Sequence, residues 1–203
     1  MNTTRLVIFD LGNVLIHVDP LQIASGLARS SELAGLQFHA QLLSSVQQWN
    51  IGLIEEYEEG KLSSEGFYER MRDQYRLRTT YDEFKAIWNA GFRENLPVTA
   101  MVFQLCKTTC VYGLSNTNPL HFEHLSTQYP VIAALHGCVL SYEIGHRKPK
   151  PKIYQAALER AGVRPEQALY VDDDQKFVAA AELLGMRAVR YRSPPELAAM
   201  LGL

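Results

Sequence analysis

Four short clusters of polar side chains in this sequence could carry chemistry, and the first is centred on Asp10. This residue follows the apolar run Leu6–Phe9 and precedes a Gly-Asn pair that predicts a sharp turn. Such a run is typical of a buried strand, and an open parallel sheet binds its ligands beyond the carboxyl ends of its strands. Taken alone, Asp10 is equally well explained as a catalytic carboxylate or as an acceptor within its own turn.

The second and third clusters offer groups that bind anions. Residues 114–118 read Leu-Ser-Asn-Thr-Asn, and their hydroxyl, amide and backbone N–H groups could hold an anion. Helix capping by Asn118 or Thr117 is the simpler interpretation of this cluster. Residues 145–151 read Gly-His-Arg-Lys-Pro-Lys-Pro, and the two prolines predict an extended loop that fixes Lys148 in place. The plain alternative for this loop is a solvated basic segment.

The fourth cluster is the run Asp172, Asp173 and Asp174, which follows the apolar run 168–171. Three neighbouring carboxylates repel one another, and this destabilises the fold unless a cation or a helix N-terminus compensates them. Helix capping explains Asp174 but not all three residues. A hard divalent cation bound by carboxylate oxygens does explain them.

The elements that must position these clusters form an alternating series after Pro97. Strand-like runs alternate there with helical patterns of about ten residues, which predicts βαβ units and a parallel sheet that also includes Leu6–Phe9. The expected strands are 6–9, 109–114, 139–140, 168–171 and 187–191. The expected helices are 98–105, 120–127, 151–161 and 176–184.

The stretch from Pro20 to Asn95 has a different character, because its apolar residues recur at helical spacing and almost no strand-like run occurs. It predicts a block of roughly four helices, inserted after the first strand. The expected helix starts are Asp19-Pro20, Ser63 or Ser64, and Thr80, and one apolar face contains Leu42, Leu43 and Val46. Such a block would cover the carboxyl ends of the strands like a lid.

Several aromatic and charged residues in or near this block admit two interpretations. Trp49, Tyr57 and Trp88 could line a substrate pocket, but such aromatics more often form the core of a bundle. His121 and His124 lie in a predicted helix without acidic partners, so no metal role is expected for them. Arg93 could touch a substrate, although a hinge residue at the surface is the simpler interpretation.

Composition bounds the class of protein. The chain has 203 residues, a formal net charge of −2 and 47% hydrophobic residues, enough to bury a substantial core. It contains no basic run and no apolar run of membrane-spanning length, so nucleic-acid and membrane partners are not expected. Cys106, Cys110 and Cys138 have no paired spacing, which favours buried free thiols. The N-terminus lacks the pattern of a secretory signal, so a cytoplasmic protein is expected.

Together the four clusters resemble the four motifs of the haloacid dehalogenase-like (HAD) hydrolase superfamily. Phe-Asp-Leu-Gly-Asn-Val-Leu, Leu-Ser-Asn-Thr-Asn, Arg-Lys-Pro and Val-Asp-Asp all occur at predicted strand ends. With Glu58-Glu59-Gly60-Lys61-Leu62-Ser63, the chain looks most like small bacterial phosphatases with a helical cap, the group of the α-glucose-1-phosphatases. The resemblance implies a Rossmann-like parallel α/β sheet with helices on both faces. Residues 1–16 and 97–203 would form this core domain, and residues 17–96 the inserted helical cap.

The resemblance also implies catalytic roles for individual residues. Asp10 would be the nucleophile and form an aspartyl-phosphate that water then hydrolyses. Ser115 and the backbone of Asn116 would hold phosphoryl oxygens. Lys148 would neutralise charge on both the nucleophile and the phosphoryl group.

The same resemblance implies a magnesium site, since a carboxylate does not approach a phosphate dianion unaided. Asp10, Asp173 and the backbone carbonyl of Gly12 would bind Mg²⁺, with Asp172 as support or as a ligand through water. Mg²⁺ retains several waters of its own, which suits so few protein ligands.

Two positions depart from the usual pattern of this superfamily. Most of its phosphatases carry a second aspartate two residues after the nucleophile as general acid and base, and here that position is Gly12. The sequence therefore does not identify the residue that gives a proton to the leaving group. Asp19 or His17 could replace the missing aspartate, but an ordinary loop or helix-cap role is the simpler interpretation of either residue. Phe177 stands where similar phosphatases often have an asparagine, which predicts weaker support of the metal ligands.

The function expected from these observations is a Mg²⁺-dependent phosphatase that acts on a small phosphorylated metabolite through an aspartyl-phosphate. The resemblance alone favours a sugar phosphate as that metabolite. One alternative is a metal-independent 2-haloacid dehalogenase. In such an enzyme no cation would compensate the negative charge of the Asp172-Asp173 pair. The other is a catalytically silent phosphate-binding protein, which Gly12 and Phe177 would favour. The oligomeric state and the substrate are not specified by the sequence.

Overall fold

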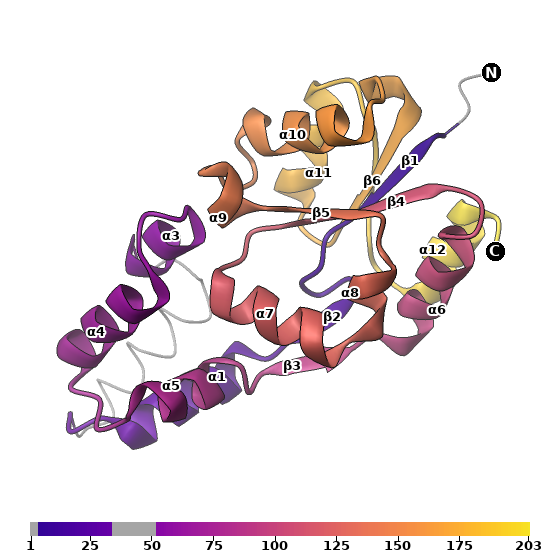
Figure 1. Cartoon of the computed structure of the whole chain (residues 1–203). Coiled ribbons are helices and arrows are strands. Elements are labelled where there is room, and N and C mark those ends of the chain that lie inside the picture. The colour runs from indigo at the N-terminus through magenta and orange to yellow at the C-terminus, as the bar shows by residue number, and fades with distance from the viewer. Residues whose placement is uncertain (1–3, 34–51) are drawn as a thin grey trace.

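The core of the computed structural model, which describes residues 4–33 and 52–203, is a parallel sheet of five strands in the order β5-β4-β1-β6-β7 (Figure 1). Its strands are β1 (Leu6–Phe9), β4 (Cys110–Ser115), β5 (Gly137–Leu140), β6 (Ala168–Asp172) and β7 (Arg187–Arg190). All four pairings are parallel. The predicted parallel α/β fold is therefore confirmed, with strand ends shifted by one or two residues.

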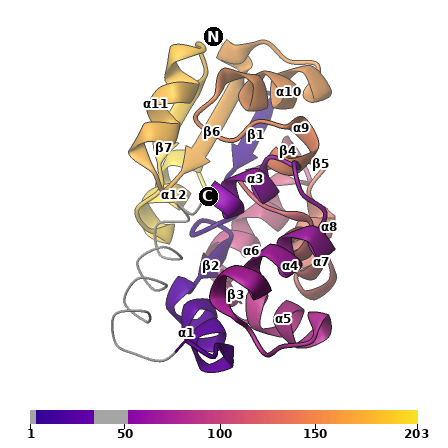
Figure 2. The same ribbon diagram turned by 90° about the vertical axis from the view of Figure 1, so that its left-hand side faces the viewer.

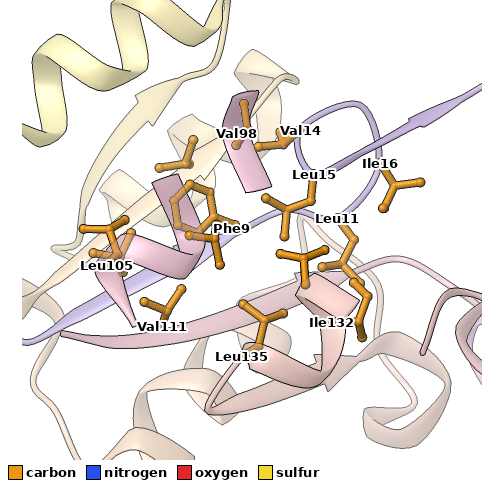
Figure 3. Packing of buried hydrophobic residues seen from close by; sticks show 14 of the residues in the cluster. Phe9, Leu11, Val14, Leu15, Ile16, Val98, Leu105, Val111, Ile132 and Leu135 are labelled. Carbon is orange, nitrogen blue, oxygen red and sulfur yellow. The ribbon is translucent and has the colours of Figure 1, made fainter. Parts of the chain in front are cut away.

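Both faces of the sheet are covered by helices, as expected. Strand β1 is buried throughout, so its alternate side chains serve two separate cores. Leu6 and Ile8 pack with residues of α10 (Pro151–Ala161) and α11 (Gln175–Leu183). Val7 and Phe9 pack on the other face (Figure 3). The helices on that face are α6 (Leu96–Leu105), α7 (Pro119–Gln128), α8 (Pro130–Ala134) and α12 (Pro194–Leu201).

The helical block lies beyond the carboxyl ends of the central strands and has a core of its own (Figure 1). Its described helices are α1 (Pro20–Ser30), α3 (Gly52–Glu58), α4 (Ser64–Tyr75) and α5 (Tyr81–Trp88). Tyr57 and Trp88 are fully buried in this core, where the Tyr57 ring stacks on Phe67 with centroids 4.3 Å apart. The bundle-core interpretation of these two aromatics is confirmed. Trp49 and the expected helix through Leu42, Leu43 and Val46 lie outside the described residues.

Three of the described helices of the block, α1, α4 and α5, begin where the sequence predicted, whereas the start of α3 was not predicted. Asp19 caps α1 by accepting from the backbone N–H groups of Leu21 and Gln22. Ser63 caps α4, and Thr80 caps α5 in a complete capping box with Glu83. Each such cap stabilises its helix by about 0.5–2 kcal/mol relative to alanine.

A two-stranded antiparallel ribbon joins the block to the sheet, and the sequence analysis did not predict it. It pairs β2 (Ile16–Val18) with β3 (Phe92–Glu94), so the expectation of an almost purely helical stretch from 20 to 95 was wrong there. Three-residue strands are too short to show a reliable alternation. Asn95 fixes the junction, because its side-chain amide donates to the Val14 carbonyl at 2.8 Å and to the Tyr191 hydroxyl at 2.9 Å.

The cysteines and the lengths of the helices bear on two expectations about the chain as a whole. The three cysteines are free, but each is only partly buried, so the expectation of buried thiols was too strong. Cys138 is the most enclosed, and burial raises the pKa of its thiol to about 11. Within residues 4–33 and 52–203, no helix combines the length and apolar character needed to cross a bilayer.

Candidate active site

The three central strands bring the sequence clusters to one place. Strand β1 lies between β4 and β6, and Phe9 pairs with Gly113 on one side and Val171 on the other. The backbone N–H of Asp10 donates to the Val171 carbonyl at 2.9 Å. A pocket of about 350 Å³ opens at this edge, where ligands bind in parallel α/β sheets. Its lining includes Asp10, Gly12, Ser115, Asn116, Thr117, Lys148, Asp173 and Phe177.

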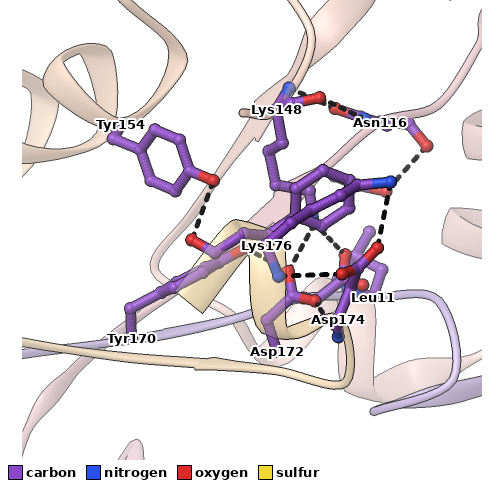
Figure 4. Close-up of polar contacts among 11 residues, drawn as sticks. Leu11, Asn116, Lys148, Tyr154, Tyr170, Asp172, Asp174 and Lys176 are labelled. Atoms are coloured by element: carbon purple, nitrogen blue, oxygen red, sulfur yellow. Dashed lines mark hydrogen bonds and ion pairs between the residues drawn. The ribbon is translucent and has the colours of Figure 1, made fainter. Parts of the chain in front are cut away.

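Lys148 links the carboxylates of two strand ends. Its Nζ lies 2.8 Å from Asp10 Oδ1 and 2.8 Å from Asp172 Oδ2, and its side chain is only 1% exposed (Figure 4). Burial alone lowers the pKa of an ammonium group, but the two carboxylates outweigh this effect and raise the pKa of Lys148. Lys148 is thus a fixed positive charge, and the alternative of a solvated basic loop is wrong for this residue.

The side chain of Asn116 holds the loop that carries Lys148. Its Oδ1 accepts from the Lys148 backbone N–H at 2.7 Å, and its Nδ2 donates to the Lys148 carbonyl at 3.1 Å. The Phe177 ring covers the ammonium group, with Nζ 4.8 Å from the ring centroid, a favourable cation–π distance. Neither contact is predictable from the sequence, because both join residues about 30 positions apart along the chain.

The acidic run divides into three roles. Asp172 is fully buried and accepts from Lys148 Nζ, from the Tyr170 hydroxyl and, at 2.8 Å, from the backbone N–H of Asp174 (Figure 4). Asp174 caps α11, as the sequence suggested. Asp173 lines the pocket and is only partly buried. Asp172 is therefore committed to protein partners, and Asp173 faces the cavity.

This cluster has the donor set of a hard-cation site. Carboxylate oxygens of Asp10, Asp172 and Asp173 lie within 4.8 Å of one another. Three carboxylates face one ammonium group, so the negative charge exceeds the positive charge. Burial, followed by the nearby Asp172 and Asp173, raises the pKa of Asp10 despite the lowering effect of Lys148. A divalent cation fits here, because it would remove this excess and because all the donors are oxygens.

The anion side of the pocket comes from the segment after β4. Ser115 and Thr117 are buried, and together with Asn116 they line the cavity. Thr117 is fixed by Ser141, whose Oγ accepts from its N–H at 2.9 Å and donates to its carbonyl at 3.0 Å. Asn118 caps α7 by accepting from the His121 N–H, so the capping interpretation is confirmed for this last residue. Ser115 and Asn116, which precede Thr117, border the cavity without serving as the cap of α7.

The helical block contributes a charged pair that the sequence analysis missed. Glu58, the last residue of α3, lines the pocket with Arg147, and Arg147 Nε lies 2.8 Å from Glu58 Oε2. Arg147 NH1 also lies 2.7 Å from Glu55 Oε1. Desolvation by burial raises the pKa of Glu58 to about 7, although Arg147 lowers it. Helix α3 packs against α9 (Ser141–Ile144), which brings it beside the sheet (Figure 2).

The other candidates lie elsewhere or are committed. Asp19 and His17 are not among the residues that line the pocket, and Asp19 caps α1. Arg93 is exposed in β3, at the junction of block and sheet. His121 does line the pocket, but it is buried against Trp88, and desolvation lowers its pKa to about 3. It is therefore a neutral ring.

The fold and the site together define a hydrolase class. Residues 4–185 match the family of haloacid dehalogenase-like hydrolases. The chain belongs to this family, and the resemblance noted from its motifs is confirmed.

Relatives along most of the chain carry more specific names. The chain is 30% identical over 186 residues to a D-ribitol-5-phosphate phosphatase of Bacteroides thetaiotaomicron, which covers 88% of this chain and 87% of the relative. It is 26% identical to a phosphorylated carbohydrates phosphatase of Thermotoga maritima, over 90% of this chain and 82% of the relative. A HAD family enzyme of Bacteroides thetaiotaomicron, solved in complex with magnesium and inorganic phosphate, superposes with a TM-score of 0.81. At 24% identity, covering 93% of this chain and 94% of that one, this likeness shows the shared fold.

Proposed function

We propose that this protein is a Mg²⁺-dependent phosphatase that hydrolyses a small phosphorylated sugar or polyol through an aspartyl-phosphate on Asp10. The observation that carries this proposal is the position of Lys148 Nζ, 2.8 Å from carboxylate oxygens of both Asp10 and Asp172 at the edge of a cavity with a third carboxylate. Curated relatives along most of the chain are phosphatases of phosphorylated carbohydrates and a polyol phosphate.

In the first step the Asp10 carboxylate attacks phosphorus, and the bond to the leaving alcohol breaks. Lys148 holds the nucleophile in position and lowers the repulsion between two negatively charged groups. Ser115, with the backbone of Asn116, binds phosphoryl oxygens at the wall of the same cavity. In the second step water attacks phosphorus, phosphate leaves, and the carboxylate of Asp10 is restored.

A bound Mg²⁺ would supply charge neutralisation and orient the phosphoryl group. Asp10, Asp173 and the Gly12 carbonyl would hold it, with Asp172 as the support. This division follows from the contacts, because Asp172 is fully buried and already accepts from three protein donors, whereas Asp173 borders the cavity.

The helical segment 17–96 acts, in this proposal, as a cap on a core formed by residues 1–16 and 97–203. Its support is the separate hydrophobic core of the block and the place of Glu58 in the wall of the pocket. A cap of this kind excludes water while the phosphoryl group is transferred. Substrate specificity would then depend on residues that the block contributes.

A metal-independent haloacid dehalogenase would have no use for a cluster of carboxylates that holds a cation. The convergence of Asp172 and Asp173 on Asp10 favours the phosphatase, because excess negative charge beside a carboxylate nucleophile is useful only with a cation present. A silent phosphate-binding protein would retain the same pocket and show no turnover.

The test is phosphate release from D-ribitol 5-phosphate and p-nitrophenyl phosphate, with Mg²⁺ or with EDTA. We expect Mg²⁺-dependent turnover that is abolished in Asp10→Asn. Asp19→Asn is the matched control, because Asp19 lies outside the pocket and asparagine also caps helices. Metal-independent release of halide from a 2-haloacid, or binding of phosphate without turnover, would overturn the proposal.

A further inference from the structure

A phosphatase that acts on an alcohol phosphate must give the leaving oxygen a proton, and this chain has glycine where most relatives in the superfamily carry an acid. The space around position 12 would accept a larger residue than glycine. A Cβ at position 12 would meet no atom closer than 3.7 Å, and Gly12 has no positive φ. The proton donor must therefore come from elsewhere in the pocket, given the proposed phosphatase function.

Most ionisable groups that line the described pocket are committed to other roles. Lys148 is bound between two carboxylates, and Asp10 is the nucleophile. Asp173 belongs to the cation cluster, Asp174 caps α11, and Lys176 pairs with Asp174 at 3.1 Å. His121 cannot donate a proton from a charged state, because its pKa lies at about 3, and one ring nitrogen lies 3.1 Å from the Trp88 carbonyl.

Glu58 is the remaining carboxyl group of the described lining, and its partner is Arg147. Its side chain is only 6% exposed, and it reaches the pocket from the helical block, opposite the strand ends. Its Oε2 atom is enclosed and lies 2.8 Å from Arg147 Nε. Glu58 thus stands in the cavity wall as part of a buried ion pair with Arg147, and it is the ionisable side chain that the described part of the helical block contributes to this wall.

We propose that Glu58 is the general acid and base of the reaction. In the first step its carboxyl proton passes to the leaving alcohol oxygen while the P–O bond to the alcohol breaks and the bond from Asp10 to phosphorus forms. In the second step the Glu58 carboxylate takes a proton from water as the water oxygen bonds to phosphorus and the bond to Asp10 breaks. The proton that left Glu58 is thereby replaced, and no other reactant is required.

The charges around Glu58 suit this role. Burial raises its pKa to about 7, against the lowering effects of Arg147 and Lys148, and Glu55 raises it further. Glu59, the next residue, pairs instead with Lys61 and Lys150 on the outer side. A group that titrates near neutral pH can be protonated in the first step and ionised in the second.

The experiment compares two leaving groups. An alcohol needs a proton to leave, whereas p-nitrophenolate is a stable anion that does not. We measure kcat/KM with Mg²⁺ for p-nitrophenyl phosphate and for a panel of alkyl phosphates that includes D-ribitol 5-phosphate. In Glu58→Gln we expect kcat/KM for the alkyl phosphates to fall by about 10²–10⁴-fold, and that for p-nitrophenyl phosphate by less than about tenfold.

The pH profile supplies a second readout. In the wild type, the ratio of kcat/KM for the alkyl phosphate to that for p-nitrophenyl phosphate falls as the pH rises through about 7, because the acid form of Glu58 is lost. Taking the ratio cancels the titration of groups that serve both substrates. In Glu58→Gln the ratio is low and independent of pH.

Glu55→Gln is the matched control. Glu55 lies on the same helix and pairs with the same arginine, but it is 45% exposed and does not line the pocket. Its loss changes kcat/KM for both substrates by no more than about fivefold, as for an exposed ion pair. In the double variant Gly12→Asp, Glu58→Gln, the aspartate at position 12 restores activity on alkyl phosphates, which a merely structural role of Glu58 does not predict.

Each contrary result has a distinct meaning. An equal loss for both substrates in Glu58→Gln would assign Glu58 to positioning Arg147 and overturn the inference. Unchanged alkyl phosphate hydrolysis would overturn it as well, and so would a wild type that hydrolyses p-nitrophenyl phosphate but no alkyl phosphate. A wild type that hydrolyses neither would refute the proposed function itself.

Discussion

Lys148 pairs with two buried carboxylates, so we expect its substitution to lower the free energy of unfolding by a measurable amount. Its ammonium group is the partner of Asp10 and Asp172, each at 2.8 Å, and the side chain is almost completely enclosed. Substitution Lys148→Met keeps most of the volume but leaves two buried carboxylates without their cation. Breaking a buried pair from one side costs about 3–5 kcal/mol.

The expected change lies within reach of urea denaturation. A loss of about 3–5 kcal/mol with an m-value of about 2 kcal/mol/M lowers the midpoint by about 1.5–2.5 M urea. A domain of this size has a total stability of the order of 10 kcal/mol, so the variant still folds. The measurement is made in EDTA, because a bound cation would compensate the carboxylates.

Lys150→Met is the matched control for this prediction. Lys150, whose side chain is 52% exposed, pairs with Glu59, which is 10% exposed and keeps Lys61 as a second partner. An exposed ion pair contributes about 0–1 kcal/mol, so this variant unfolds close to the wild type. If Lys148→Met were no less stable than Lys150→Met, the charge balance assigned to the site would be wrong.

Three further outcomes test separate parts of the account. Asn116→Ala removes both hydrogen bonds to the Lys148 backbone. Because the ammonium group is then misplaced, kcat/KM falls by about 10²-fold, and a fully active variant would contradict this. Asp19→Ala loses the cap of α1, and its melting temperature falls by about 1–8 °C with activity retained, as circular dichroism and phosphate release would show. Mg²⁺ at about 100 times its Kd stabilises the wild type by about 2.7 kcal/mol in thermal melts, and Asp173→Asn loses this gain; an equal gain in both proteins would remove Asp173 from the metal site.

The parts of the site that lie at strand ends were predictable from the sequence. Asp10, Ser115 and Asp173 each follow an apolar run, and the carboxyl ends of parallel strands meet at one edge of the sheet. Their convergence was therefore expected from the fold class together with the family resemblance. The roles assigned to them in catalysis stay predictions until activity is measured.

The parts that depend on long-range packing were not predictable in this way. Asn116 was expected to act through its backbone, yet its side chain holds the Lys148 loop. Phe177 was expected to weaken the support of the metal ligands, which stays a prediction, and the packing of its ring over the lysine ammonium was not foreseen. Glu58 lies in a stretch that reads as an ordinary charged helix. Its place in the pocket depends on long-range contacts of α3 with α9 and with Arg147.

The claim on which everything else depends is that Asp10 carries the phosphoryl group during turnover, and chemical trapping tests it most directly. The enzyme is mixed with a ³²P-labelled sugar phosphate and Mg²⁺, quenched in acid and digested. The account predicts a label on the peptide that contains Asp10, sensitive to hydroxylamine as an acyl phosphate is, and absent from Asp10→Asn. Turnover without such a label, or a hydroxylamine-resistant label on Ser115, would contradict it.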